Sequence, residues 1–321
     1  MVASARMLSQ MGSGLSLHDM GEAARHTPAA AIAISLLATM ISFACLAYYD
    51  RFASEAIAPG RIERKHACFT GGVSHAFSNT LGFPALTGTA MRYRLYGQRG
   101  LPAPDIARVT VLAGLCVGLG SLCVFSLALL GADESPAWAK VAATAGLLGL
   151  LGVVASYPAW SIRLRLRDSR LPTASRVALL LPLGTGVVEA TAAILALYVL
   201  LPAESAMPFA KFVALATGAM LLGVLSHAPG GVGVFEATIL AAFPASSRSG
   251  ILAALLVYRL LYNLLPFFLS CAALGVQQAR TTSIGGRVAR HQPLLRQVQS
   301  RQTIHADGTV ASATVGRRDL K

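Results

Sequence analysis

Charged and amide side chains stand inside long apolar runs of this sequence. Glu189 lies in the middle of TGVVEATAAILALYVL, and Arg259 is followed one helical turn later by Asn263 in LLVYRLLYNLLPF. A charge at the centre of a bilayer costs about 2.5 to 3.5 kcal/mol even on a lenient scale, so such residues face a helix bundle and pair. Two interpretations follow: a Glu189–Arg259 ion pair that sets helix register, or a polar site for a charged substrate.

A helix break with an acid beside it occurs in SHAPGGVGVFEA, residues 226–237. A proline and three glycines interrupt the apolar segment, and a half-helix is predicted to begin near Val232. Its positive N-terminal end would face the break, where backbone N–H groups can hold an anion such as a lipid phosphate. Glu236 either binds a cation there or is only an acid in the first turn of the helix. The candidate binding glycines are Gly230, Gly231 and Gly233.

A second interrupted segment covers residues 67–97, is rich in Gly, Ser, Thr and Asn, and ends in MRYRLYG. Pro84 removes a backbone donor within it. Small residues favour close helix contacts, whereas irregular backbone at membrane depth needs protein or a water-filled cavity around it. The segment is therefore a tight helix–helix interface or a cavity wall that contacts a polar substrate. Its candidate binding residues are Asn79, Arg92 and Arg94, although the two arginines could instead anchor a helix end at the membrane surface.

The elements that must position these residues are membrane helices. Of the 321 residues, 55% are hydrophobic and 13% are charged, and several apolar runs approach or exceed the roughly 20 residues that cross a bilayer. We predict an all-α polytopic membrane helix bundle of about six to eight spans, with one or two broken or re-entrant helices. Clear spans are predicted at 29–49, 106–131, 138–160, 177–201, 209–227 and 250–277, whereas 229–243 is too short to cross alone.

The net charge of +13 arises largely from arginines in the 161–176 loop and in the C-terminal tail. This is the positive-inside pattern, so we expect both segments to be cytoplasmic and the 132–137 and 202–208 loops to lie outside. Residues 67–91 are either a full span or a re-entrant hairpin. Because no aromatic and basic platform accompanies the arginines, a nucleic-acid partner is not expected.

Three parts are predicted: a polar N-terminal segment at 1–28, a transmembrane domain at 29–278 and a basic, disordered tail at 279–321. The sequence offers no nucleophile–base pair, metal-ligand cluster or phosphate-binding loop, so neither a catalytic residue nor a metal or cofactor is expected. A weak internal sequence similarity relates SHAFSNTLGF and RYRLYG to SHAPGGVGVFE and YRLLYN. It suggests two related halves, as in transporters built from repeats.

Three stretches together carry a resemblance to a known family: SNTLGFPALTGTAMRYRLYGQRGL (78–101), SHAPGGVGVFEATIL (226–240) and YRLLYNLLPF (258–267). They resemble the flippase-type transmembrane domain of bacterial lysylphosphatidylglycerol synthetases, the multiple peptide resistance factors, and its stand-alone relatives. The resemblance covers roughly residues 15–278. It implies an inner-membrane protein that moves aminoacylated phosphatidylglycerol to the outer leaflet, which lowers negative surface charge and repels cationic antimicrobial peptides.

Two departures from the family pattern bear on activity. Full-length members carry a soluble aminoacyltransferase domain, and the stretch after residue 278 is too short to fold one, so we do not expect this chain alone to be an enzyme. Family members also usually have additional membrane helix before the segment that matches 29–49.

The resemblance implies roles for the candidate residues. The arginines Arg92, Arg94 and Arg259, with the glycine break, suit the phosphate of an aminoacylated lipid, and Glu189 and Glu236 suit its ammonium groups. The amides of Asn79 and Asn263 are further candidate contacts. Two alternatives remain: a membrane platform for a separately encoded aminoacyl- or glycosyltransferase, and a polytopic solute transporter. The partners left open are a phospholipid, such a transferase and a second copy of this chain.

Overall fold

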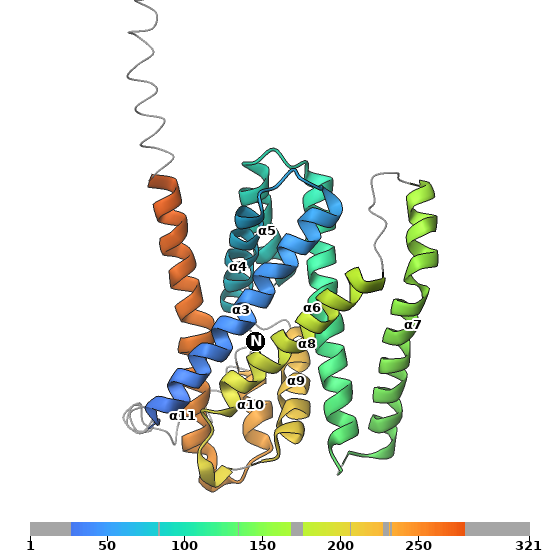
Figure 1. Ribbon diagram of the computed structural model, residues 1–321. Coiled ribbons are helices and arrows are strands. Elements are labelled where there is room, and N and C mark those ends of the chain that lie inside the picture. Colours follow the sequence, from blue (N-terminus) through green and yellow to red (C-terminus); the bar gives the residue numbers. More distant parts are fainter. Residues whose placement is uncertain are drawn as a thin grey trace, which may run out of the picture. The chain divides into compact units, whose positions relative to one another are not determined.

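The computed structural model describes residues 27–82, 84–133, 135–167, 176–205, 207–226, 231 and 233–279. Every regular element in these residues is helical (Figure 1), which confirms the all-α prediction. The chain divides into two units, Met1–Phe268 and Leu269–Lys321. The first unit holds all the elements described below, and the second contributes helical residues up to Ala279. The predicted polar segment and basic tail lie almost entirely outside the described residues.

Five stretches of the described residues are long and apolar enough to cross a membrane. They are Ala29–Ile57, Ala103–Gly131, Ala137–Ser156, Leu180–Tyr198 and Ala245–Ala279. The first four lie in α3 (Ala29–Ile57), α6 (Ala103–Gly131), α7 (Ala137–Arg167) and α8 (Arg176–Tyr198). Helices suit this environment because each satisfies its own backbone hydrogen bonds where no water is present. The chain is therefore a polytopic membrane protein.

The segment around Pro84 folds as a helical hairpin, α4 (Arg64–Leu81) and α5 (Pro84–Gly97). Gly82 ends α4 with a φ of 76°, and Pro84 is the first residue of α5, where its missing N–H costs no hydrogen bond. The His66 Nε2 atom lies 3.1 Å from the Leu95 carbonyl oxygen, so the start of α4 meets the end of α5. The two helices are antiparallel, and the hairpin returns the chain to the side from which it started.

The second break separates α9 (Phe209–Leu225) from α10 (Val234–Ala241). α10 begins two residues later than the predicted Val232, because Gly231 and Gly233 have φ angles of 65° and 89°, which are not helical and which other residues rarely adopt. With 8 residues, α10 is about 12 Å long and cannot cross a bilayer. This confirms the prediction that the segment is too short to span alone.

The last helix is not uniform. A short 3₁₀ turn, η1 (Ala203–Ser205), precedes α9, and a second one, η3 (Ala245–Ser247), leads directly into α11 (Arg248–Tyr258). α11 continues into a π-helix, η4 (Arg259–Leu264). The helix then resumes from residue 265. π-helical turns are rare, occur mostly as single turns within α-helices, and are frequent at functional sites. This one contains both Arg259 and Asn263.

Close helix crossings and two apolar clusters hold these elements together. α6 and α8 meet at Gly120 and Gly186, where a Cβ atom on Gly186 would lie 2.7 Å from the Gly120 Cα atom. One apolar cluster joins α8, α9, α10 and α11 around Phe212 and Ile239. The other joins α3, α5 and α6 around Tyr49. Small residues therefore set the closest contact, as is usual between membrane helices.

The hairpin makes a topological prediction. Because α4 and α5 return to their starting side, residues 58–63 and 98–102 lie on one side of the membrane. α6 then carries the chain across, so residues 132–136 lie on the other, and α8 ends there as well. The arginine pattern predicts that the first side is cytoplasmic.

Cysteine labelling tests this arrangement. All five native cysteines are unpaired and are replaced first, and single cysteines are then introduced as Glu63→Cys, Gln98→Cys, Asp133→Cys and Glu204→Cys. A membrane-impermeant maleimide should label the first two only in inside-out vesicles and the last two only in right-side-out vesicles. Labelling of Glu63→Cys and Gln98→Cys from opposite sides would contradict the hairpin.

Candidate functional site

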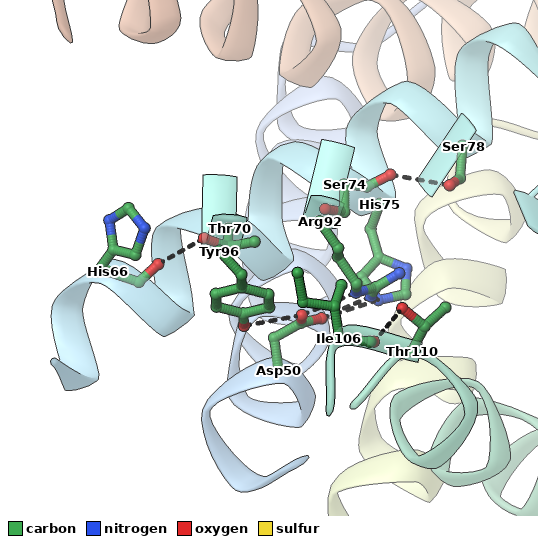
Figure 2. A network of polar contacts seen from close by, with 10 residues as sticks. All are labelled: Asp50, His66, Thr70, Ser74, His75, Ser78, Arg92, Tyr96, Ile106 and Thr110. Carbon is green, nitrogen blue, oxygen red and sulfur yellow. Dashed lines mark hydrogen bonds and ion pairs between the residues drawn. The ribbon is translucent and has the colours of Figure 1, made fainter. Parts of the chain in front are cut away.

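A buried cluster of four polar side chains ties the hairpin to α3 (Figure 2). We call Asp50, His75, Arg92 and Tyr96 the hairpin cluster. Arg92 on α5 donates from Nε to Asp50 Oδ1 at 2.8 Å and from Nη2 to Asp50 Oδ2 at 2.6 Å. Asp50 is 0% exposed and Arg92 is 4% exposed. This two-point geometry is the strongest arrangement of a guanidinium and a carboxylate.

The other two members of the cluster complete its hydrogen bonds. The Tyr96 hydroxyl donates to Asp50 Oδ1 at 3.1 Å. The Arg92 Nη2 atom lies 3.1 Å from His75 Nε2. A guanidinium can only donate, so Nε2 accepts and the imidazole of His75 is neutral.

Glycines permit the close approach that this cluster needs. A Cβ atom on Gly71 of α4 would lie 2.7 Å from the Asp50 Cβ atom, and one on Gly88 of α5 would lie 2.5 Å from Ser78 Oγ. Real Cβ atoms do not approach so closely, so α3, α4 and α5 pack at distances that only glycine allows. The tight-interface interpretation of residues 67–97 is confirmed at these two positions.

Sequence reasoning missed Asp50, because it ended the first predicted span at residue 49. The structure corrects this assignment, because α3 continues to Ile57. The signal was available: no proline or glycine interrupts the chain before Pro59 and Gly60, so nothing ends the helix at Tyr49. The two arginines of MRYRLYG also separate, since Arg92 is buried while Arg94 is exposed in the last turn of α5.

Glu236 and Arg259, which we call the break-side pair, join α10 to the π-helix. Arg259 donates from Nε and Nη2 to Glu236 Oε1 at 2.8 and 2.6 Å. The Gly233 N–H donates to Glu236 Oε2 at 2.7 Å. Glu236 is thus an acid of the first turn, as one sequence interpretation held, and also a counter-ion. The Arg259 and Glu236 side chains remain 20% and 14% exposed.

The alternative pairing predicted from sequence is wrong. Arg259 forms its ion pair with Glu236 and not with Glu189, because the short α10 brings Glu236 against the last helix. The glycines of the break are only partly described: Gly230 lies outside the described residues. Gly231 contacts α9, where its Cβ atom would lie 3.5 Å from the Gly223 Cα atom.

Glu189 occupies a third environment. It is 6% exposed on α8, and its Oε1 atom accepts a hydrogen bond of 3.2 Å from Ser42 Oγ on α3. Ser42 Oγ lies 2.8 Å from the Tyr262 hydroxyl on the π-helix. Three helices therefore meet at a chain of two hydroxyls and one carboxyl group.

The two asparagines predicted to bind substrate also meet, through backbone as well as side chain. Asn263 Nδ2 donates to the Asn79 carbonyl oxygen at 2.8 Å. Thr80 Oγ1 donates to the Asn263 carbonyl oxygen at 3.0 Å. The end of α4 is therefore bonded directly to the π-helix, next to the hairpin turn at Gly82.

Comparison with known proteins places the chain in a family. It is 30% identical over 216 residues to "Uncharacterized protein slr0712" of Synechocystis, an alignment that covers 64% of this chain and 67% of that protein. The chain belongs to the same family as this protein. It is also 28% identical over 234 residues to "Inner membrane protein YbhN" of Escherichia coli, covering 68% of this chain and 72% of the relative. No model of a protein family matches, and neither relative's name states a substrate or a reaction.

The hairpin cluster predicts a large stability effect at Asp50. We expect Asp50→Asn to lower the free energy of unfolding by about 3 to 5 kcal/mol, because it leaves the buried Arg92 charge without its counter-ion. The measurement is unfolding by sodium dodecyl sulfate in mixed micelles, followed by circular dichroism. The double variant Asp50→Asn/Arg92→Gln should lose less than the sum of the two single variants, because the pair acts as one unit.

A matched control is the surface pair of Asp105 and Arg108, 3.3 Å apart, in which the arginine is 54% exposed. Asp105→Asn should cost at most about 1 kcal/mol. If Asp50→Asn costs no more than Asp105→Asn, the hairpin cluster does not hold the hairpin in place.

Proposed function

We propose that the chain is a flippase-like lipid translocase, which moves aminoacylated phosphatidylglycerol or a related phospholipid between the leaflets of the bacterial inner membrane. The observation that carries the proposal is the break-side pair. Glu236 and Arg259 are a partly exposed acid and base at an interrupted helix of a membrane protein. Such a pair matches a head group that itself carries both charges.

The physical argument concerns the cost of moving a head group across hydrocarbon. Burying an unpaired charge costs many kcal/mol, so a translocase must keep every charge partnered throughout. A lipid with a phosphate and ammonium groups can replace the internal pair by two external ones: its phosphate binds Arg259 while an ammonium group binds Glu236. No charge is left alone when the pair opens, and the acyl chains stay in the lipid phase.

Arg92 and Arg259 differ in burial, and we assign them different roles for this reason. Arg92 is 4% exposed and donates from both Nε and Nη2 to Asp50, so we assign it to the frame that holds the hairpin. Arg259 is more exposed and contacts the Phe235 ring, with the guanidinium carbon 6.0 Å from the ring centroid. Stacking on the ring keeps the planar set of guanidinium N–H donors in one orientation while the counter-ion changes. We therefore assign the phosphate to Arg259.

Two further observations support the proposal. The E. coli relative is an inner membrane protein, which favours the same membrane for this chain. The three stretches that resemble the flippase-type domain include Asn79, Glu236, Arg259 and Asn263, and in the structure these residues join α4, α10 and the π-helix. With the arginine-rich tail on the cytoplasmic side, as the charge pattern predicts, the outward product would reduce negative surface charge and the binding of cationic antimicrobial peptides.

A reconstitution assay tests the proposal. Purified protein is placed in liposomes with fluorescent phosphatidylglycerol or its lysyl ester, and dithionite bleaches the lipid in the outer leaflet. Protein-free liposomes should lose about half of the signal, because only the outer leaflet is accessible. Liposomes with the protein should lose more. If folded, monodisperse protein gives no additional loss with either lipid, the proposal is contradicted, and co-purification with a transferase becomes the relevant experiment.

Variants of the break-side pair give a more specific prediction. Arg259→Ala should slow translocation of both lipids by about tenfold to a hundredfold, because charge-assisted hydrogen bonds contribute about 1.5 to 3 kcal/mol. Arg259→Lys should retain part of the rate, since it keeps the charge but lacks the planar pair of donors that binds a phosphate at two points. The control Arg108→Ala changes an exposed arginine on α6 and should leave the rate unchanged.

Glu236→Gln should affect the translocation rates of the two lipids differently. Gln keeps an oxygen that can accept from the Gly233 N–H but removes the negative charge that an ammonium group needs. The variant should therefore slow the lysyl ester more than phosphatidylglycerol itself. Equal slowing of the two lipids, or no slowing of either, would show that Glu236 does not bind the cationic part of the head group.

A further inference from the structure

The carboxyl group of Glu189, on a predicted membrane-spanning helix, is buried and has no cationic partner among the described residues. It is 6% exposed, and its neighbours Ala190, Ala193 and Ile194 belong to the main apolar cluster. Among the described residues its only hydrogen-bond donor is Ser42, and it forms no ion pair. Arg92 and Arg259 do not pair with it, because Arg92 bonds Asp50 and Arg259 bonds Glu236.

The single hydrogen bond to Glu189 among the described residues is long, beyond the usual range of about 2.5 to 3.0 Å for O–H···O bonds. Ser42 Oγ lies 3.2 Å from Glu189 Oε1, whereas a hydroxyl that donates to an ionised carboxylate lies at about 2.5 to 2.7 Å. The carboxylate of Asp50, by contrast, receives Arg92 at 2.6 and 2.8 Å. One long bond from a hydroxyl does not offset the cost of an ionised carboxylate in an apolar region.

The other titratable groups that face Glu189 are neutral near physiological pH. They are Cys45 and Tyr49 on α3, Cys116 on α6 next to Tyr49, Tyr258 at the end of α11 and Tyr262 on the π-helix. Tyr258 also interacts electrostatically with both members of the break-side pair. None of these five side chains offers Glu189 a positive charge, because thiols and phenols are either neutral or anionic.

A second observation points to a polar ligand beside the carboxyl group. The Tyr49 hydroxyl has no hydrogen-bond partner among the described residues, and Tyr49 is 0% exposed. It lies 3.2 Å from the position that a Cβ atom on Gly186 would occupy, one helical turn before Glu189 on α8. A buried hydroxyl without a partner costs about 1 to 3 kcal/mol, so the structure retains an unused donor and acceptor next to this acid.

We propose that Glu189 is a proton-binding site, whose carboxyl group holds a proton in the state shown here and exchanges it for a cationic group of the substrate. When an ammonium group arrives, the carboxyl O–H bond breaks, its electron pair stays on the carboxylate, and the proton passes to water. One positive charge replaces another, so the interior gains no net charge. The Tyr49 and Ser42 hydroxyls then contact the incoming ammonium group and the carboxylate.

The exchange half of this inference rests on the proposed lipid translocation, whereas the protonation half does not. If substrate and proton exchange one for one, lipid movement in one direction is coupled to proton movement in the other. A difference of one pH unit across the membrane would then bias the distribution of the cationic lipid up to about tenfold. Phosphatidylglycerol without an amino acid has no ammonium group and should show no such bias.

Infrared difference spectroscopy tests the protonation directly and needs no lipid movement. Wild-type protein in bilayers near neutral pH should show the C=O stretch of a protonated carboxyl group, and the band should be missing from Glu189→Gln. Glu204→Gln, which changes an exposed acid, is the matched control and should keep the band. If the wild type and Glu189→Gln have the same protonated-carboxyl absorption, Glu189 is ionised and the inference is wrong.

A second experiment tests the exchange. Liposomes with the wild-type protein and the fluorescent lysyl ester are given a pH gradient with the membrane potential clamped to zero. Protons flow away from the more acidic side, so exchange moves the lipid in the opposite direction, and the lipid should accumulate in the leaflet that faces the more acidic compartment. A protonophore should abolish this asymmetry. Glu189→Gln should give no asymmetry at any gradient, while Glu204→Gln should behave as wild type.

The outcomes separate the two proposals. If the wild type moves lipid but distributes it evenly with and without the gradient, the exchange is overturned and the translocase proposal stands. If the wild type moves no lipid at all, the translocase proposal fails and with it the exchange, while the infrared result still decides whether Glu189 binds a proton.

Discussion

Charged groups inside a membrane must find their partners within the protein, because hydrocarbon offers none. In the described residues each interrupted segment meets this constraint with one ion pair. Arg92 ties the α4–α5 hairpin to Asp50 on α3, and Glu236 ties α10 to Arg259 on the last helix. A break in a membrane helix exposes backbone groups and loosens the segment, so these pairs are what allow the breaks to persist in defined positions.

The π-helix connects the two interrupted segments to each other. Within six residues it directs Arg259 to α10, Tyr262 to Ser42 on α3, and Asn263 to the end of α4. An ordinary α-helix places residues three and four apart on one face, whereas a π-helical turn alters that spacing. Its contacts with α3, α4 and α10 make this turn a common joint, through which a shift of the last helix would act on both segments together.

Three acids of similar chemistry lie in different surroundings, and this difference is the basis of the different roles that we propose for them. Asp50 is fully buried with a bidentate arginine, which suits a structural pair that never opens. Glu236 has the same kind of partner but remains partly exposed, which suits a pair that exchanges partners with a head group. Among the described residues Glu189 is buried with the Ser42 hydroxyl as its single partner, which suits a group that carries a proton. Exposure and the nature of the partner distinguish these roles, and residue type does not.

The sequence by itself determined the membrane class, the two interrupted segments and most of the polar residues within them, because apolar run length and the backbone chemistry of Gly82, Pro84 and Gly233 act locally. Which charges meet was decided only by the tertiary structure. Glu189 and Glu236 stand in equally apolar sequence, yet Arg259 pairs with the second, and Asp50 belongs to a helix that sequence reasoning ended too early. The physical reason is that partner choice depends on where helices cross, and close contacts such as those at Gly71 and between Gly120 and Gly186 join residues far apart in the chain.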